Sequence, residues 1–97
     1  MDELLSRALI QHVGKGRSPF PLSDDDAVRE LADADGDTLL AWVRAVETEM
    51  MSIEIDWSSR TLSDGGDEAE HILARRHPEL SADALNALRW MFTYNWR

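Results

Sequence analysis

The sequence predicts an all-α protein, a compact bundle of four to five helices arranged around one long central helix. Apolar residues recur at spacings of three and four in several segments, which places them on one side of an α-helix. Glycines and prolines separate these segments. A chain of 97 residues can bury only one sizeable core, so residues 1–97 are expected to form a single domain.

The first helix is predicted over residues 3–13. Leu5, Leu9 and Val13 recur every four residues and would share one side of this helix. Gly14 follows and can adopt the left-handed conformation that commonly ends a helix.

A second helix is predicted to begin at Ser23, after a proline-containing loop over residues 14–22. The Ser23 hydroxyl can cap the helix, and the aspartates at 24–26 fill the first turn, where the helix dipole favours negative charge. Val28 and Leu31 give this helix a narrow apolar edge.

The central helix is predicted over residues 38–57, with Asp37 as its N-cap. Its apolar residues form a seam at alternating spacings of four and three: Leu39, Val43, Val46, Met50, Ile53 and Trp57. Glu47 and Glu54 lie between this seam and a second apolar stripe, so they are expected to be partly buried. A buried carboxylate is costly unless it is paired, and an arginine is the expected partner.

Two further helices complete the prediction. A loop over residues 58–66, ended by Gly65 and Gly66, is expected to precede a fourth helix that Asp67 caps and that runs to about Arg76. Ser81 is the predicted N-cap of a last helix that runs to the end of the sequence.

An α+β fold is the alternative. Residues 51–57 and 89–96 alternate between apolar and polar side chains, which is the pattern of a half-buried strand. Both segments also continue helical patterns of at least two turns without a helix breaker, so helix is preferred.

Negative charge is concentrated in the middle of the chain. The formal net charge is -9, and residues 18–59 account for it, with eleven acidic side chains against two arginines. The flanking segments 1–17 and 60–97 are close to neutral, at +1 and -1. Such a potential opposes the approach of nucleic acid and anionic lipid and attracts a basic protein, so direct nucleic acid binding and membrane binding are not expected.

The composition favours a cytoplasmic protein. There is no cysteine, so no disulfide and no thiolate ligand is available. Asp2 and Glu3 at the start, and the lack of eighteen consecutive apolar residues, argue against a signal peptide and a membrane span.

Neither calcium binding nor a di-iron site is expected, and no cofactor is implied. Residues 33–38 resemble the start of a calcium loop, but Thr38 stands where that loop needs glycine and Arg44 where it needs glutamate. Glu68 and His71 have the Glu-x-x-His spacing of di-iron bundles, yet the required second copy is missing.

Catalysis and DNA binding are also not expected. The sequence contains no Ser-His-Asp set, no glycine-rich phosphate loop and no nucleophile elbow. The last two helices could be a helix-turn-helix, but Arg75, Arg76 and Arg89 are balanced there by acidic residues, which makes a poor phosphate-binding surface.

Three aromatic residues stand apart from the predicted core stripes. Trp42 lies at the edge of the central seam, and Trp90 and Tyr94 lie off the main apolar stripe of the last helix. Exposed tryptophan and tyrosine beside acidic residues are typical anchors of protein interfaces. These three residues are the predicted anchors.

The runs Asp37-Thr38-Leu39, Val46-Glu47-Thr48-Glu49 and Ile53-Glu54-Ile55 resemble acyl carrier proteins over about residues 28–73. The resemblance implies a small acidic four-helix domain with a serine that carries phosphopantetheine. Thr38 occupies the position of that serine, so the resemblance leaves a carrier-like domain without a usable attachment serine as a minor alternative.

The predicted function is that of a small acidic module that docks on a basic partner protein and inhibits it. An immunity protein or antitoxin acting on a toxin or a nucleic-acid-acting enzyme fits this description, as does an anti-factor. The alternative is a homodimeric structural subunit. Electrostatic steering is assigned to the following residues: Asp24, Asp25, Asp26, Glu30, Asp33, Asp35, Glu47 and Glu49.

Overall fold

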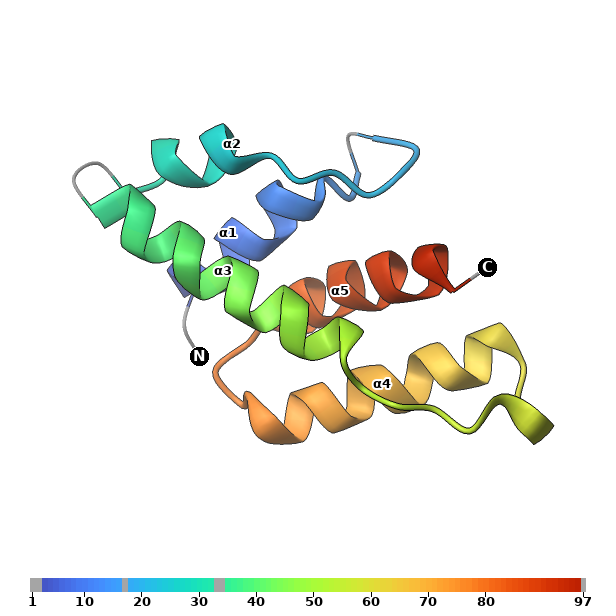
Figure 1. Ribbon diagram of the computed structural model, residues 1–97. Helices are drawn as coiled ribbons and strands as arrows, with labels where there is room; N and C mark the ends of the chain where they lie inside the picture. Colours follow the sequence, from blue (N-terminus) through green and yellow to red (C-terminus); the bar gives the residue numbers. More distant parts are fainter. Residues whose placement is uncertain (1–2, 17, 33–34, 97) are drawn as a thin grey trace.

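Helices alone build the regular structure of the described residues. The computed structural model describes residues 3–16, 18–32 and 35–96 (Figure 1). The helices are α1 (Glu3–Val13), α2 (Asp25–Glu30), α3 (Gly36–Met51), α4 (Leu62–Arg76) and α5 (Ala82–Asn95), with a 3₁₀ turn η2 (Trp57–Ser59). The all-α prediction is confirmed. The strand alternative is wrong in the described segments 51–57 and 89–96, because α5 covers most of the second and an irregular connection with η2 covers most of the first.

The core lies where α1 packs against α2, α3 and α5, while α4 pairs with α5 in antiparallel fashion (Figure 1). The largest fully buried side chains come from all five helices: Leu5, Leu9, His12, Val13, Val28, Val43, Val46, Met50, Leu73, Leu88 and Phe92. One hydrogen bond also ties α1 to the start of α5, since the buried Ser6 hydroxyl accepts from the Ser81 amide at 2.9 Å. The predicted first helix and the Ser81 cap are confirmed.

Helix α3 is central, but it is shorter than the predicted 38–57 helix. It begins at Gly36 with Asp35 as the N-cap residue, so Asp37 lies within the first turn and is not the cap. It ends at Met51, and the Ser52 hydroxyl donates to the Glu49 carbonyl at 2.8 Å. A side-chain hydroxyl that bonds a backbone carbonyl of the last turn helps to satisfy the open end of the helix.

Helix α4 begins earlier than predicted. Thr61 caps it, its hydroxyl accepting from the Asp64 amide at 3.1 Å, so the predicted loop over 58–66 is half helical and Asp67 is not the cap. Gly65 and Gly66 lie inside the helix and are buried. The lack of a side chain at both positions lets Trp57 and Thr93 pack closely against α4, and it does not break the helix.

Helix α2 is held at its start by Asp24 and not by Ser23. The Asp24 carboxylate accepts from the Ala27 amide at 3.1 Å, which places the cap one residue later than predicted. At the end of α1, Gly14 has a φ of 79°, as the prediction of a left-handed glycine required.

Candidate functional site

The acidic residues predicted to steer a partner differ in their surroundings, and Asp24, the N-cap of α2, is partly buried. Asp25, Glu47 and Glu49 are engaged in ion pairs within the protein and are partly buried. Asp26, Glu30 and Asp35 are exposed. Asp33 lies outside the described residues.

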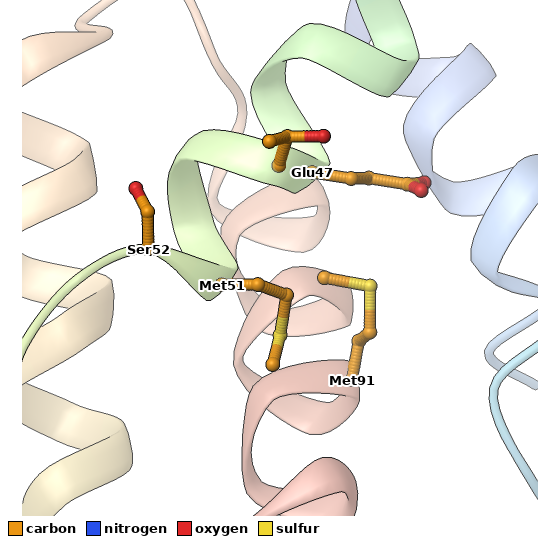
Figure 2. Close-up of a pocket in the computed structure, with 5 residues that line it drawn as sticks. Glu47, Met51, Ser52 and Met91 are labelled. Carbon is orange, nitrogen blue, oxygen red and sulfur yellow. The ribbon is translucent and has the colours of Figure 1, made fainter.

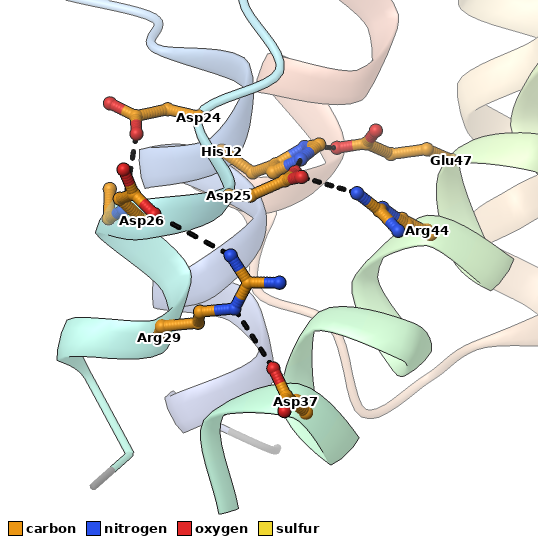
Figure 3. Close-up of polar contacts among 9 residues, drawn as sticks. His12, Asp24, Asp25, Asp26, Arg29, Asp37, Arg44 and Glu47 are labelled. Carbon is orange, nitrogen blue, oxygen red and sulfur yellow. Dashed lines mark hydrogen bonds and ion pairs between the residues drawn. The ribbon is translucent and has the colours of Figure 1, made fainter.

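Asp25 and Glu47 meet on one buried histidine, His12 of α1 (Figure 3). The ring of His12 is 2% exposed, its Nδ1 lies 2.6 Å from Glu47 of α3, and its Nε2 lies 2.8 Å from Asp25 of α2. Arg44 of α3 reaches the other oxygen of Asp25. Three helices therefore join at one imidazole, and we call these four residues the His12 cluster.

The His12 cluster corrects the prediction that an arginine pairs with Glu47. Arg44, the nearest candidate, turns to Asp25, and Glu47 takes a histidine that lies 35 residues earlier in the chain. Glu54, the other carboxylate predicted to be partly buried, is exposed because the chain leaves the helix before it.

The cluster perturbs the pKa of its members. Burial by itself lowers the pKa of His12, but the hydrogen bonds to Glu47 and Asp25 and their negative charges outweigh burial, so the pKa of His12 is raised above its ordinary 6.5. The hydrogen bond from His12 is in turn the main reason that the pKa of Asp25 is lowered. The charged forms of both groups are favoured together.

A second histidine, His77, is held in the same way between two carboxylates. It follows α4, and its ring nitrogens lie 2.9 Å from Glu49 of α3 and 2.8 Å from Glu79. Arg76 also approaches Glu49, at 3.6 Å. Burial lowers the pKa of His77, whereas the hydrogen bonds to both glutamates raise it, and the net shift is upward. Glu49 thus joins α3 to the end of α4.

Four exposed carboxylates lie on α2 and at the start of α3. We use the term acidic surface for Asp26, Glu30, Asp35 and Asp37, which are all exposed. Arg29 lies among them, its Nε 2.9 Å from Asp37 and its Nη1 3.5 Å from Asp26 (Figure 3). One guanidinium against four carboxylates leaves this surface strongly negative. Asp37 was not among the residues predicted for steering.

Trp42 lies on the outer side of α3 and is 45% exposed. Asp35, Trp42 and Glu49 follow one another at intervals of seven residues, so they lie along one side of the helix. Ala45, one turn further along the helix, is also exposed. Nearly half of the Trp42 surface is therefore accessible to a partner.

The other two predicted anchors differ from each other. Trp90 packs against the core and is only partly exposed, whereas Tyr94 is 37% exposed. Sequence reasoning missed Trp96, which is 47% exposed and lies with Trp57 and Phe92 in one aromatic cluster at ring separations of 5.7–6.4 Å.

A shallow groove of about 470 Å³ lies between the end of α3 and α5 (Figure 2). It is lined by Glu47, Thr48, Met51, Ser52 and Met91. Figure 2 shows the thioethers of Met51 and Met91 beside each other, while Glu47 extends away from them. The lining therefore offers apolar sulfur contacts, and its one carboxylate is already bonded to His12.

Residues considered for metal or nucleic acid binding have structural partners. Glu68 pairs with Arg60, and His71 is exposed beside it on α4. Arg89 donates to Asp67 at 2.9 Å and to the Ser63 carbonyl at 3.1 Å, which joins α5 to α4. Within the ranges that the structure describes, no group of three or more histidine, aspartate or glutamate side chains could hold a metal ion.

Among the helices of the described ranges, none has the length and the hydropathy needed to cross a bilayer.

Comparison with known proteins found no match: no protein family, no curated protein and no solved structure matches this chain.

Proposed function

We propose that this protein is a docking module whose acidic surface attracts a basic partner protein and whose Trp42 anchors the complex. The observations that support the proposal are four exposed carboxylates, on α2 and at the start of α3, and the exposed Trp42 further along α3. Helix α3 therefore carries exposed negative charge at its start and an exposed aromatic ring in its middle.

The two features would act at different stages of binding. Opposite charge accelerates encounter, from about 10⁵–10⁶ M⁻¹s⁻¹ for uncharged surfaces to as much as about 10⁸–10⁹ M⁻¹s⁻¹ at low salt. A tryptophan that becomes fully buried at the centre of an interface slows dissociation, because aromatic residues dominate the binding free energy of many complexes. The acidic surface would determine the association rate, and Trp42 would determine the lifetime of the complex.

A partner that carries a cationic surface fits best, and nucleases, nucleic-acid-modifying toxins and other nucleic-acid-acting enzymes carry such surfaces to bind phosphate. A protein that covers this surface would inhibit the enzyme. An immunity protein, an antitoxin or an anti-factor is therefore the proposed biological role.

The structure also changes which residues should be tested. Asp24 caps α2 and Asp25 belongs to the His12 cluster, so replacing them would change contacts within the protein as well as the surface charge. The informative variant is the triple replacement Asp26→Asn, Glu30→Gln and Asp37→Asn on the acidic surface.

A matched control removes three negative charges elsewhere, by Asp64→Asn, Glu70→Gln and Asp83→Asn on α4 and α5. Both variants change the net charge equally, so they separate local attraction from overall charge. Circular dichroism would first establish that both keep the helical content of the parent protein.

The experiment is a stopped-flow measurement of association with the partner captured from the native host, at several salt concentrations. The acidic-surface variant should associate at least about tenfold more slowly at low salt, with a weaker salt dependence, and the control should stay close to the parent. Trp42→Ala should mainly raise the dissociation rate. Equal association rates for the two triple variants, or an association rate indifferent to salt, would contradict the proposal.

Self-association is the second candidate, favoured by two exposed aromatic residues, Tyr94 and Trp96, near the end of α5. Sedimentation of the isolated protein at micromolar concentration distinguishes the two. A dimer that Trp96→Ala converts to a monomer supports the homodimer, and a monomer throughout excludes it.

A further inference from the structure

The His12 cluster does more than neutralise charge, because it joins α2 to α1 and α3, in addition to the ion pair of Arg29 with Asp37. Helix α2 has six residues, and Val28 is its one fully buried side chain. Asp25 fixes the start of the helix to His12 and Arg44, and the Asp24 amide donates to the His12 carbonyl at 3.1 Å. So short a helix depends on such contacts, since helices of this length are not stable by themselves in water.

The geometry around His12 suits one protonation state. Both ring nitrogens face a carboxylate oxygen, at 2.6 and 2.8 Å. A neutral imidazole has a single N–H and would direct a lone pair at one of the two carboxylates, whereas an imidazolium donates to both. The arrangement as built therefore requires the imidazolium.

We propose that protonated His12 is a latch that holds α2 against α1 and α3, and that loss of its proton at alkaline pH releases α2 while the other helices stay folded. The raised pKa of His12 supports the same assignment. The proposal concerns the isolated protein and does not depend on a partner.

The charged groups around His12 determine which helix responds when His12 loses its proton. Asp25 faces it from α2 and Glu47 from α3, and Arg44 of α3 acts through Asp25. Helix α5 also packs against α1, but its described residues contribute none of the charged groups that interact with His12. A neutral His12 has one N–H for two carboxylates, so its bond to Asp25 weakens or is lost, and Arg44 remains as the partner of Asp25.

Helix α3 stays in place because apolar side chains, and not a titrating ion pair, attach it to the core. Leu39, Val43, Val46 and Met50 bury it in the core, and these apolar contacts do not titrate. Release of α2 would leave the core helices together and would remove Asp26 and Glu30 from their fixed positions beside Asp37.

The sign of the effect follows from linkage. The hydrogen bond and the charge of Asp25 raise the pKa of His12, and His12 loses both when α2 is released, so through this contact the docked state binds the proton more tightly than the released state. Docking of α2 is strongest while His12 is protonated and weakens as the pH rises through the pKa of His12 in the docked state. Each unit by which the two pKa values differ changes the opening equilibrium about tenfold.

The test is amide hydrogen exchange by NMR between pH 5.5 and 9, after division by the intrinsic base-catalysed rate. The corrected exchange of residues 27–31 should rise with pH by about tenfold per unit of pKa difference, while the core amides of α1, α3 and α5 stay protected. In the same samples, ring nitrogen spectra should show His12 protonated on both nitrogens at the acidic end. A flat profile for residues 27–31, simultaneous loss of protection in the core helices, or a neutral His12 at pH 5.5 would each overturn the proposal.

Two variants make the assignment specific. Asp25→Asn places an amide beside His12 that can donate to the neutral ring, so its α2 should stay docked across the pH range. His77→Gln removes the other carboxylate-bound histidine and should leave the pH dependence of α2 unchanged. The proposal is wrong if Asp25→Asn keeps the parent's pH dependence or if His77→Gln abolishes it.

Discussion

Gly65 of α4 provides a direct test of the packing around the aromatic cluster. A Cβ atom at this position would lie 2.3 Å from two ring atoms of Trp57, which is closer than atoms can approach. The Trp57 ring stacks on Phe92 with centroids 6.4 Å apart and lies 5.7 Å from Trp96. Gly65→Ala must therefore displace the Trp57 ring.

Two effects of Gly65→Ala oppose each other. Alanine in the middle of a helix is more favourable than glycine by about 1 kcal/mol. Overpacking a filled site costs about 1–3 kcal/mol, and if Trp57 swings outward the loss of two aromatic contacts costs about 0.5–1.5 kcal/mol each. At the middle of these ranges packing should outweigh helix propensity by about 1 kcal/mol, which lowers the Tm of a domain of this size by roughly 4–8 °C.

The assay is urea and thermal unfolding of a double-mutant cycle with Trp57→Ala. Without the indole ring the clash disappears, so Gly65→Ala should stabilise the Trp57→Ala background by about 1 kcal/mol. His71→Ala, on an exposed site of the same helix, is the control and should change stability by less than about 0.5 kcal/mol. If Gly65→Ala destabilises both backgrounds by the same amount, contact with Trp57 is not the cause.

Two further predictions concern polar groups of the fold. Ser6→Ala removes the acceptor of the Ser81 amide and should lower the free energy of unfolding by about 1–3 kcal/mol, measured by urea unfolding; an unchanged midpoint would show that water replaces the hydroxyl. The pKa of His77 is raised, so its stabilising contribution is complete below about pH 6.5 and is lost as the pH rises through its pKa in the folded protein. His77→Gln should therefore flatten the decline in stability on the alkaline side, and a decline as steep as the parent's would contradict this.

The sequence predicted most of the helices because their signals are local. The four-residue spacing of α1, the left-handed Gly14 and the Ser81 cap each involve residues within one turn of each other. Such signals do not depend on what packs against the helix.

The errors arose where distant contacts decide the structure. Gly65 and Gly66 were predicted to break the helix, yet α4 runs through them. Glycine is needed at these positions because Trp57 and Thr93 occupy the space that side chains would need. The end of α3 at Met51 also has no glycine or proline to mark it. The apolar periodicity continues past Met51 because Ile53 is also buried, although it lies in the irregular segment that follows the helix.

The His12 cluster could be found only in part. Partial burial of Glu47 was predicted from its place between apolar stripes and is confirmed, but its partner lies on another helix, at no fixed spacing. His12 follows Leu5 by seven residues and Leu9 by three, so it falls on the buried side of α1. This position on the helix was the signal from which a buried histidine with polar partners could have been predicted.

The contact of α1 with α5 has a consequence for how the chain folds as it leaves the ribosome. The two helices are separated by most of the sequence, yet each covers apolar residues of the other. During synthesis, the part of α1 that packs against α5 remains in water until residues 82–95 have emerged. Native structure should therefore form late and cooperatively, and a nascent chain arrested before α5 should bind chaperones that recognise exposed apolar segments.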